Sequence, residues 1–124
     1  MVRLAVGDRL RFICQFYHQG DSYTGAKLHV AIGKGGTFGF NEKLNADSVA
    51  LSFPVNVNRK LYQQTVDVPI TSAISEGTDY EAYVKLMSIP GPDLFWYGPI
   101  NDIKIETSVG VAQFTNLTVT YSKV

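Results

Sequence analysis

Apolar and polar residues alternate with a period close to two along most of this chain. Successive side chains of a strand point to opposite faces of a sheet, so this period predicts half-buried β-strands. No amphipathic helical pattern of useful length is present in the sequence. Strands are expected at residues 4–6, 9–17, 27–32, 47–53, 61–70, 80–87, 95–97 with 100–106, and 112–121.

The same alternation predicts which side chains face the core. They are Leu10, Phe12, Cys14 and Phe16; Leu28, Val30 and Ile32; Val49, Leu51 and Phe53; Tyr62, Val66, Val68 and Ile70; Tyr80, Ala82, Val84 and Leu86; and Phe114, Leu117, Val119 and Tyr121. The alternation slips between Phe114 and Leu117, which indicates a bulge in the last strand.

Seven to nine short strands, separated by turns rich in Gly, Pro and Asn, predict an all-β fold. We expect two antiparallel layers packed as a sandwich. The segment Gly33–Ala46 is expected to be a flexible loop, because its glycines fit no phosphate-binding motif and no helix follows them. With no linker, repeat or low-complexity tract, residues 1–124 are expected to form a single domain.

One local feature is more specific than the strand pattern. An apolar residue, Ile74, leads into the turn Gly77-Thr78-Asp79, and a strand starts at Tyr80. This spacing resembles the tyrosine corner of fibronectin type III and other immunoglobulin-like sandwiches, in which a Tyr hydroxyl bonds to upstream backbone. We therefore expect Tyr80 to face the core and to bond to the backbone between Ile74 and Gly77.

The resemblance extends over the larger part of the chain. Val6-Gly7-Asp8 before a strand, a turn at Gly20, and the corner at Gly77 and Tyr80 resemble the immunoglobulin-like modules of bacterial and archaeal surface proteins, including the cell-adhesion-related (CARDB-like) group. The resemblance implies an immunoglobulin-like sandwich. It brings no binding residues, because such modules share none, and Gly33–Ala46 is longer and richer in Gly than a minimal module requires.

Composition argues against several kinds of partner. Eleven basic and eleven acidic side chains cancel, so the chain lacks the positive footprint of a phosphate-backbone binder and nucleic acid is not an expected partner. The N-terminus has no signal-peptide core, and no apolar run approaches the ~18 residues of a membrane helix. We expect no membrane insertion and a cytoplasmic location for the chain as written, with a cell-surface or virion assembly as the alternative.

No set of catalytic or metal-ligating residues stands out. Cys14, the only cysteine, is in phase with the Phe residues beside it and is expected to be a buried small hydrophobe. His18 and His29 are expected on a turn and on an outward strand face, without ligands at metal-binding spacing. A calcium ion at one end of the sandwich stays an open alternative, because five Asp residues are expected in turns: Asp21, Asp47, Asp79, Asp93 and Asp102. No enzyme activity, metal or cofactor is expected.

Aromatic residues supply the candidate interaction surface. Phe38 and Phe40 stand on the Gly-rich segment, and we expect them to fold back over one end of the sandwich; an exposed patch is the alternative. Phe95, Trp96 and Tyr97 are consecutive, so at least one of them must point away from the core. We expect Trp96 to fill the core, with a protein interface, or a sugar ring stacked on Trp96 or Tyr97, as the alternatives.

Together these patterns favour a non-enzymatic structural or protein-interaction module of a surface or virion type of assembly. Its partner would be protein, including a second copy of itself. Charged residues make up only 18% of the chain, against about 25% in an average domain. Low charge leaves strand edges less protected against pairing, so self-association is expected. A carbohydrate-binding module that uses exposed aromatic rings is the alternative.

Overall fold

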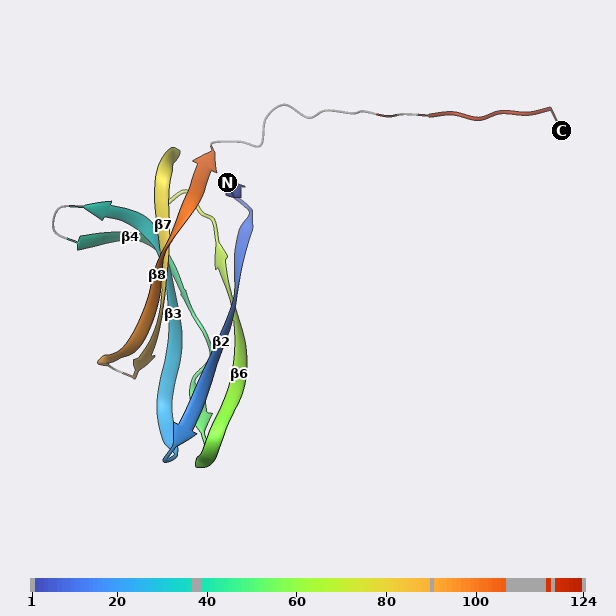
Figure 1. Cartoon of the computed structure of the whole chain (residues 1–124). Helices are drawn as coiled ribbons and strands as arrows, with labels where there is room; N and C mark the ends of the chain where they lie inside the picture. Colours follow the sequence, from blue (N-terminus) through green and yellow to red (C-terminus); the bar gives the residue numbers. More distant parts are fainter. Residues whose placement is uncertain (1, 37–38, 90, 107–115, 117, 124) are drawn as a thin grey trace.

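The computed structural model describes residues 2–36, 39–89, 91–106, 116 and 118–123. These residues form strands and no helix, which confirms the predicted all-β class (Figure 1). The strands are β1 (Val2–Ala5), β2 (Arg9–Gly20), β3 (Tyr23–Gly36), β4 (Gly39–Asp47), β5 (Leu51–Phe53), β6 (Asn56–Pro69), β7 (Gly77–Ser88) and β8 (Asp93–Glu106). Within the described ranges no helix is long and apolar enough to cross a membrane.

The strands form one large and one small sheet. The large sheet has the order β1-β8-β7-β3-β4, with β5 also paired to β3, and the small sheet consists of β2 and β6. Neighbouring strands are antiparallel as expected, except that β1 runs parallel to β8 and pairs Ala5 with Glu106. The large sheet is therefore mixed rather than purely antiparallel.

A tight turn explains this exception, because it moves the chain from the large sheet to the small one. Gly7 adopts a φ of 102°, in the left-handed region that glycine adopts readily. The Asp8 amide donates to the carbonyl of Ala5 at 3.0 Å, and the Asp8 carboxylate accepts from the Ala5 amide at 2.9 Å. The chain thus leaves β1 at the edge of one sheet and enters β2 in the other, so β1 does not form a hairpin with its successor.

The core lies between the two sheets. Inward residues of β3 are almost fully buried, with Leu28 at 2% exposure and Val30 and Ile32 at 0%. Residues of β6 join the same cluster, and alternate residues of β2 pack against it. They are Val66 and Val68, and Leu10, Phe12, Cys14 and Phe16. The predicted phases of these strands are confirmed, whereas Val49, expected inward, precedes β5 and is 70% exposed.

The expected flexible loop at Gly33–Ala46 is wrong. Here β3 continues to Gly36, and β4 returns antiparallel to it, with a register shift between Ile32 and Gly33. A Cβ atom on Gly33 would overlap the backbone oxygen of Asn41 and lie 2.8 Å from its carbonyl carbon. Glycine therefore permits two strand backbones to approach closely at a bulge. Composition alone does not distinguish glycines with this role from glycines in a loop.

The predicted tyrosine corner is confirmed in its geometry. Tyr80 is 2% exposed, and its hydroxyl donates to the backbone oxygen of Ser75 at 2.7 Å, within the expected stretch. A Cβ atom on Gly77 would lie 3.4 Å from the Tyr80 ring, so glycine lets the ring lie close to the backbone. Asp79, with a φ of 67°, bends the start of β7 where its register with β8 shifts.

The expected closing strand at 112–121 falls mostly outside the described residues, and Phe114 and Leu117 are among those not described. Residues 118–123 are described and belong to no strand. Two of the apolar residues expected to face the core are instead exposed here, Val119 at 75% and Tyr121 at 95%.

Candidate functional site

The small sheet does not cover the whole width of the large one, and this leaves a groove. Of the strands of the large sheet, β6 contacts mainly β4 and β3, on one side of that sheet. β2 lies beside β6, and in the described part of the chain no strand continues the small sheet beyond β2. The face of β7 and β8 next to the outer edge of β2 is therefore incompletely covered.

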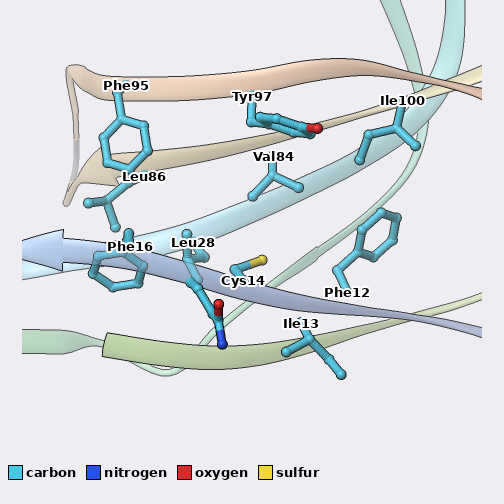
Figure 2. Close-up of a pocket in the computed structure, with 11 residues that line it drawn as sticks. Phe12, Ile13, Cys14, Phe16, Leu28, Val84, Leu86, Phe95, Tyr97 and Ile100 are labelled. Carbon is cyan, nitrogen blue, oxygen red and sulfur yellow. The ribbon is translucent and has the colours of Figure 1, made fainter. Parts of the chain in front are cut away.

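This inter-sheet groove has a volume of about 350 Å³ (Figure 2). One wall comes from β2 and the other from β3, β7 and β8. The lining residues are Phe12, Ile13, Cys14, Gln15 and Phe16 on one wall, and Leu28, Val84, Leu86, Phe95, Tyr97 and Ile100 on the other. In Figure 2, Cys14 and Phe12 extend from β2 toward the opposite wall, where Val84 and Ile100 lie. The groove is therefore apolar.

The three consecutive aromatic residues of β8 divide between two faces of the large sheet. Phe95 and Tyr97 line the groove and are 49% and 68% exposed. Trp96 points to the outer face, away from the small sheet, and lies against Tyr83 with ring centroids 5.7 Å apart. It is 61% exposed, so the expectation that Trp96 fills the core is wrong. Alternation along β8 puts Trp96 on the side opposite the core.

The Gly-rich segment contributes to the outer face, not to an end of the fold. Phe40, on β4, is half-buried and packs edge-on against Tyr83 at 4.7 Å. It therefore does not fold back over an end of the molecule, and Phe38 lies outside the described residues. Of the five predicted surface residues, the structure brings Phe95 and Tyr97 together in the groove and places Phe40 and Trp96 on either side of Tyr83.

The wall that β2 supplies was not predicted as a site. Sequence alternation correctly predicts that Phe12, Cys14 and Phe16 face inward, but it does not show how completely the opposite sheet covers them. All three are only half-buried, because they line the open groove between β2 and β8. The number of strands in each sheet would have indicated the groove, but the pattern of strands along the sequence does not give that number.

Cys14 sits in the groove as a half-buried thiol. Burial raises the pKa of the Cys14 thiol, which lowers the fraction of reactive thiolate at neutral pH. This agrees with its predicted character as a small hydrophobe rather than a nucleophile.

Two unpaired strand edges border the groove. β2 is paired with β6 from Arg9 to His18, and its other edge has no partner strand in the described part of the chain. β1 covers β8 only from Ile103 to Glu106, which leaves the outer edge of β8 unpaired near Phe95 and Tyr97. Free backbone N–H and C=O groups therefore flank the apolar lining.

A polar cluster on the outer face of the large sheet was also not predicted. His29 Nδ1 lies 2.6 Å from Asp47 Oδ1, and its Nε2 lies 2.8 Å from Glu42 Oε1. Lys27 donates to the other oxygen of Asp47 at 3.1 Å. A neutral imidazole has only one N–H, so both carboxylate bonds form together only when the ring carries two protons. The β3–β4 hairpin creates this cluster, and the sequence pattern predicts a loop where Glu42 lies.

The Asp residues do not gather at one end of the molecule. Asp21 lies in the predicted turn, but Asp47, Asp79, Asp93 and Asp102 belong to strands, so the turn assignment for these four is wrong. His18, also expected on a turn, lies on β2 and bonds to the backbone oxygen of Asp21 at 2.9 Å. Among the described residues, no group of three or more His, Cys, Asp and Glu is arranged to hold a metal ion.

The cluster predicts a pH-dependent contribution to stability. Burial acts to raise the pKa of Asp47, but hydrogen bonds and charge from His29 and Lys27 outweigh it and lower that pKa. A lowered carboxylate pKa stabilises the fold above the unfolded value of about 3.9, and this is lost as pH falls through the folded value. In urea unfolding, Asp47→Asn should therefore lose up to about 1 kcal/mol near neutral pH, and the loss should shrink progressively as pH falls below about 3.9. Asp21→Asn, in the exposed turn, is the control; a loss at Asp47 that is independent of pH would contradict the argument.

Comparison of the chain with protein-family models, with curated proteins and with solved structures finds no match.

Proposed function

We propose that this protein is a non-enzymatic structural module that associates with protein partners, including copies of itself, through the inter-sheet groove. The observation that carries the proposal is an open apolar groove in which Phe95 and Tyr97 are 49% and 68% exposed. Aromatic side chains that stay exposed beside an apolar pocket are typical anchors of protein interfaces.

The strand edges support the same function. A strand added to a free edge satisfies the unpaired backbone groups, while pockets along the sheet receive alternate side chains. Here the free edge of β2 and the apolar lining lie side by side, so an added strand would gain both kinds of contact at once. A long free edge that is not protected favours association.

The chemistry of the lining supports a binding role rather than catalysis. Most of the lining is aliphatic or aromatic, and the amide of Gln15 donates to Gln63 on the exposed face of β6 at 2.9 Å. The Cys14 thiol has a raised pKa, and Tyr97 supplies a phenol. General acid–base catalysis needs a group that titrates near the working pH, and this lining has no carboxylate or imidazole.

We further infer that the two sheets form an immunoglobulin-like sandwich in a single domain, of the kind repeated in adhesion modules of surface proteins or in virion assemblies. The Tyr80–Ser75 bond and the glycine beneath the Tyr80 ring support this inference. Carbohydrate binding, the alternative, has weaker support. Phe95 and Tyr97 lie on the face opposite Trp96, and the planes of Trp96 and Tyr83 are inclined at 58°, so these rings form no common flat platform.

Light scattering over a concentration series tests the proposal. We expect the wild-type chain to associate in the micromolar range, and Tyr97→Glu, which places a charge in the groove, to remain monomeric. Trp96→Glu is the matched control, because it adds the same charge at the adjacent residue on the outer face. A wild-type monomer at high micromolar concentration would contradict self-association, and equal effects of the two variants would show that the groove is not the interface.

A further inference from the structure

The groove and the exposed C-terminal residues have complementary properties. On one side there is a free edge of β2 beside an apolar groove. On the other there is a segment, Ala112–Tyr121, whose sequence predicts a strand as long as the paired part of β2, Arg9–His18. In the described part of that segment, Val119 and Tyr121 are 75% and 95% exposed.

We propose that the C-terminal segment of a second copy of this chain pairs with the free edge of β2 and places its apolar side chains in the groove. The inference rests on the proposed function and names the partner. Val119 and Tyr121 stand two residues apart, so on a strand both would face the groove while Thr118 and Thr120 face solvent. The added strand would complete the small sheet over β7 and β8.

Chain connectivity favours a second copy over the segment of the same chain. Glu106, the last residue of β8, pairs with Ala5 and therefore lies near the start of β2. The chain from Glu106 to Ala112 spans at most about 20 Å, whereas β2 from Arg9 to His18 is about 30 Å long. The segment of the same chain cannot reach the far end of β2 and return, so it could pair only parallel to β2. A segment from another copy can run antiparallel, which is the more stable pairing.

Cys14 makes this arrangement directly testable, because it is the only cysteine and it lines the groove. Wild-type chain is mixed with a Cys14→Ala chain that also carries Val119→Cys or Tyr121→Cys, and the mixture is oxidised with glutathione disulfide. We expect a disulfide between the two different chains, because inward residues of paired strands bring their Cβ atoms within about 5 Å of each other. Cys14→Ala chains with Thr118→Cys or Thr120→Cys are the matched controls and should form at least about tenfold less of the mixed dimer.

A second measurement does not depend on the register of pairing. The double variant Val119→Asp, Tyr121→Asp changes two exposed residues, so its fold should be kept, as circular dichroism can verify. Light scattering should show that the concentration below which the oligomer dissociates is at least about tenfold higher for this variant than for the wild-type chain.

The possible outcomes separate this inference from the proposed function. An oligomer that persists in the double variant and gives no selective cross-link would overturn the inference while leaving self-association through the groove intact. A disulfide that forms within one chain carrying both Cys14 and Val119→Cys, in a monomer, would show that the occupant is the segment of the same chain and would also overturn the inference. A wild-type monomer would overturn both proposals.

Discussion

Gly33→Ala is expected to destabilise the protein by about 3 kcal/mol in urea unfolding, the upper end of the usual cost of overpacking. The new methyl group would overlap the backbone oxygen of Asn41 on β4. Backbone cannot rotate away as a side chain can, so the bulge between β3 and β4 must open. The neighbouring pair, Ile32 with Leu44, belongs to the buried core, and the loss therefore extends beyond the hairpin.

Gly35→Ala is the matched control for this change. Its methyl group would meet the carboxylate of Glu81 at 3.4 Å, and that flexible side chain can move aside. We expect a change within about 0.5 kcal/mol. Similar losses for the two variants would mean that glycine is needed in this hairpin for its backbone freedom and not for the close approach to Asn41.

The sequence identified the strands whose side chains alternate cleanly. Leu28, Val30 and Ile32 were predicted inward and are almost fully buried. The prediction succeeds because burial of one face of a sheet imposes a period of two on apolar residues. That period can be read along one strand without knowing which strands pair with it. The same reasoning failed at Gly33–Ala46, because glycine has no side chain and so does not indicate which face of the sheet it lies on.

The groove was not predictable for a different reason. Phe12, Cys14 and Phe16 carry the same alternation as core residues, and only the number of strands in each sheet decides whether they are covered. The number of strands in a layer depends on pairing between distant segments, which local pattern does not encode. Consecutive aromatic residues did indicate correctly that β8 presents rings on both faces, although the face assigned to Trp96 was wrong.

The polar cluster illustrates the same limit. His29, Glu42 and Asp47 come together only because β4 folds back along β3 in one particular register. His29 was predicted to face outward and does so. Its partners are not apparent from the sequence, because the pattern predicts a loop for the segment that carries Glu42.

Tyr80→Phe is expected to reduce stability by about 1–2 kcal/mol. The ring stays buried, so packing is retained, but the backbone oxygen of Ser75 loses the hydroxyl that donates to it at 2.7 Å. The bond ties the segment before β7 to the first buried residue of that strand. Removing it should also loosen the segment that includes Ile74, which contributes to the core.

Tyr83→Phe provides the matched control for this corner, because it deletes the same atom three residues along the same strand. Tyr83 lies on the outer face between Phe40 and Trp96, and its ring contacts do not involve the hydroxyl. We expect its stability to change by no more than about 0.5 kcal/mol. Urea unfolding of both variants, at one low protein concentration so that association does not contribute, compares them directly. A larger loss at Tyr83 than at Tyr80 would show that the corner bond does not stabilise this fold, and would remove the main local support for an immunoglobulin-like sandwich.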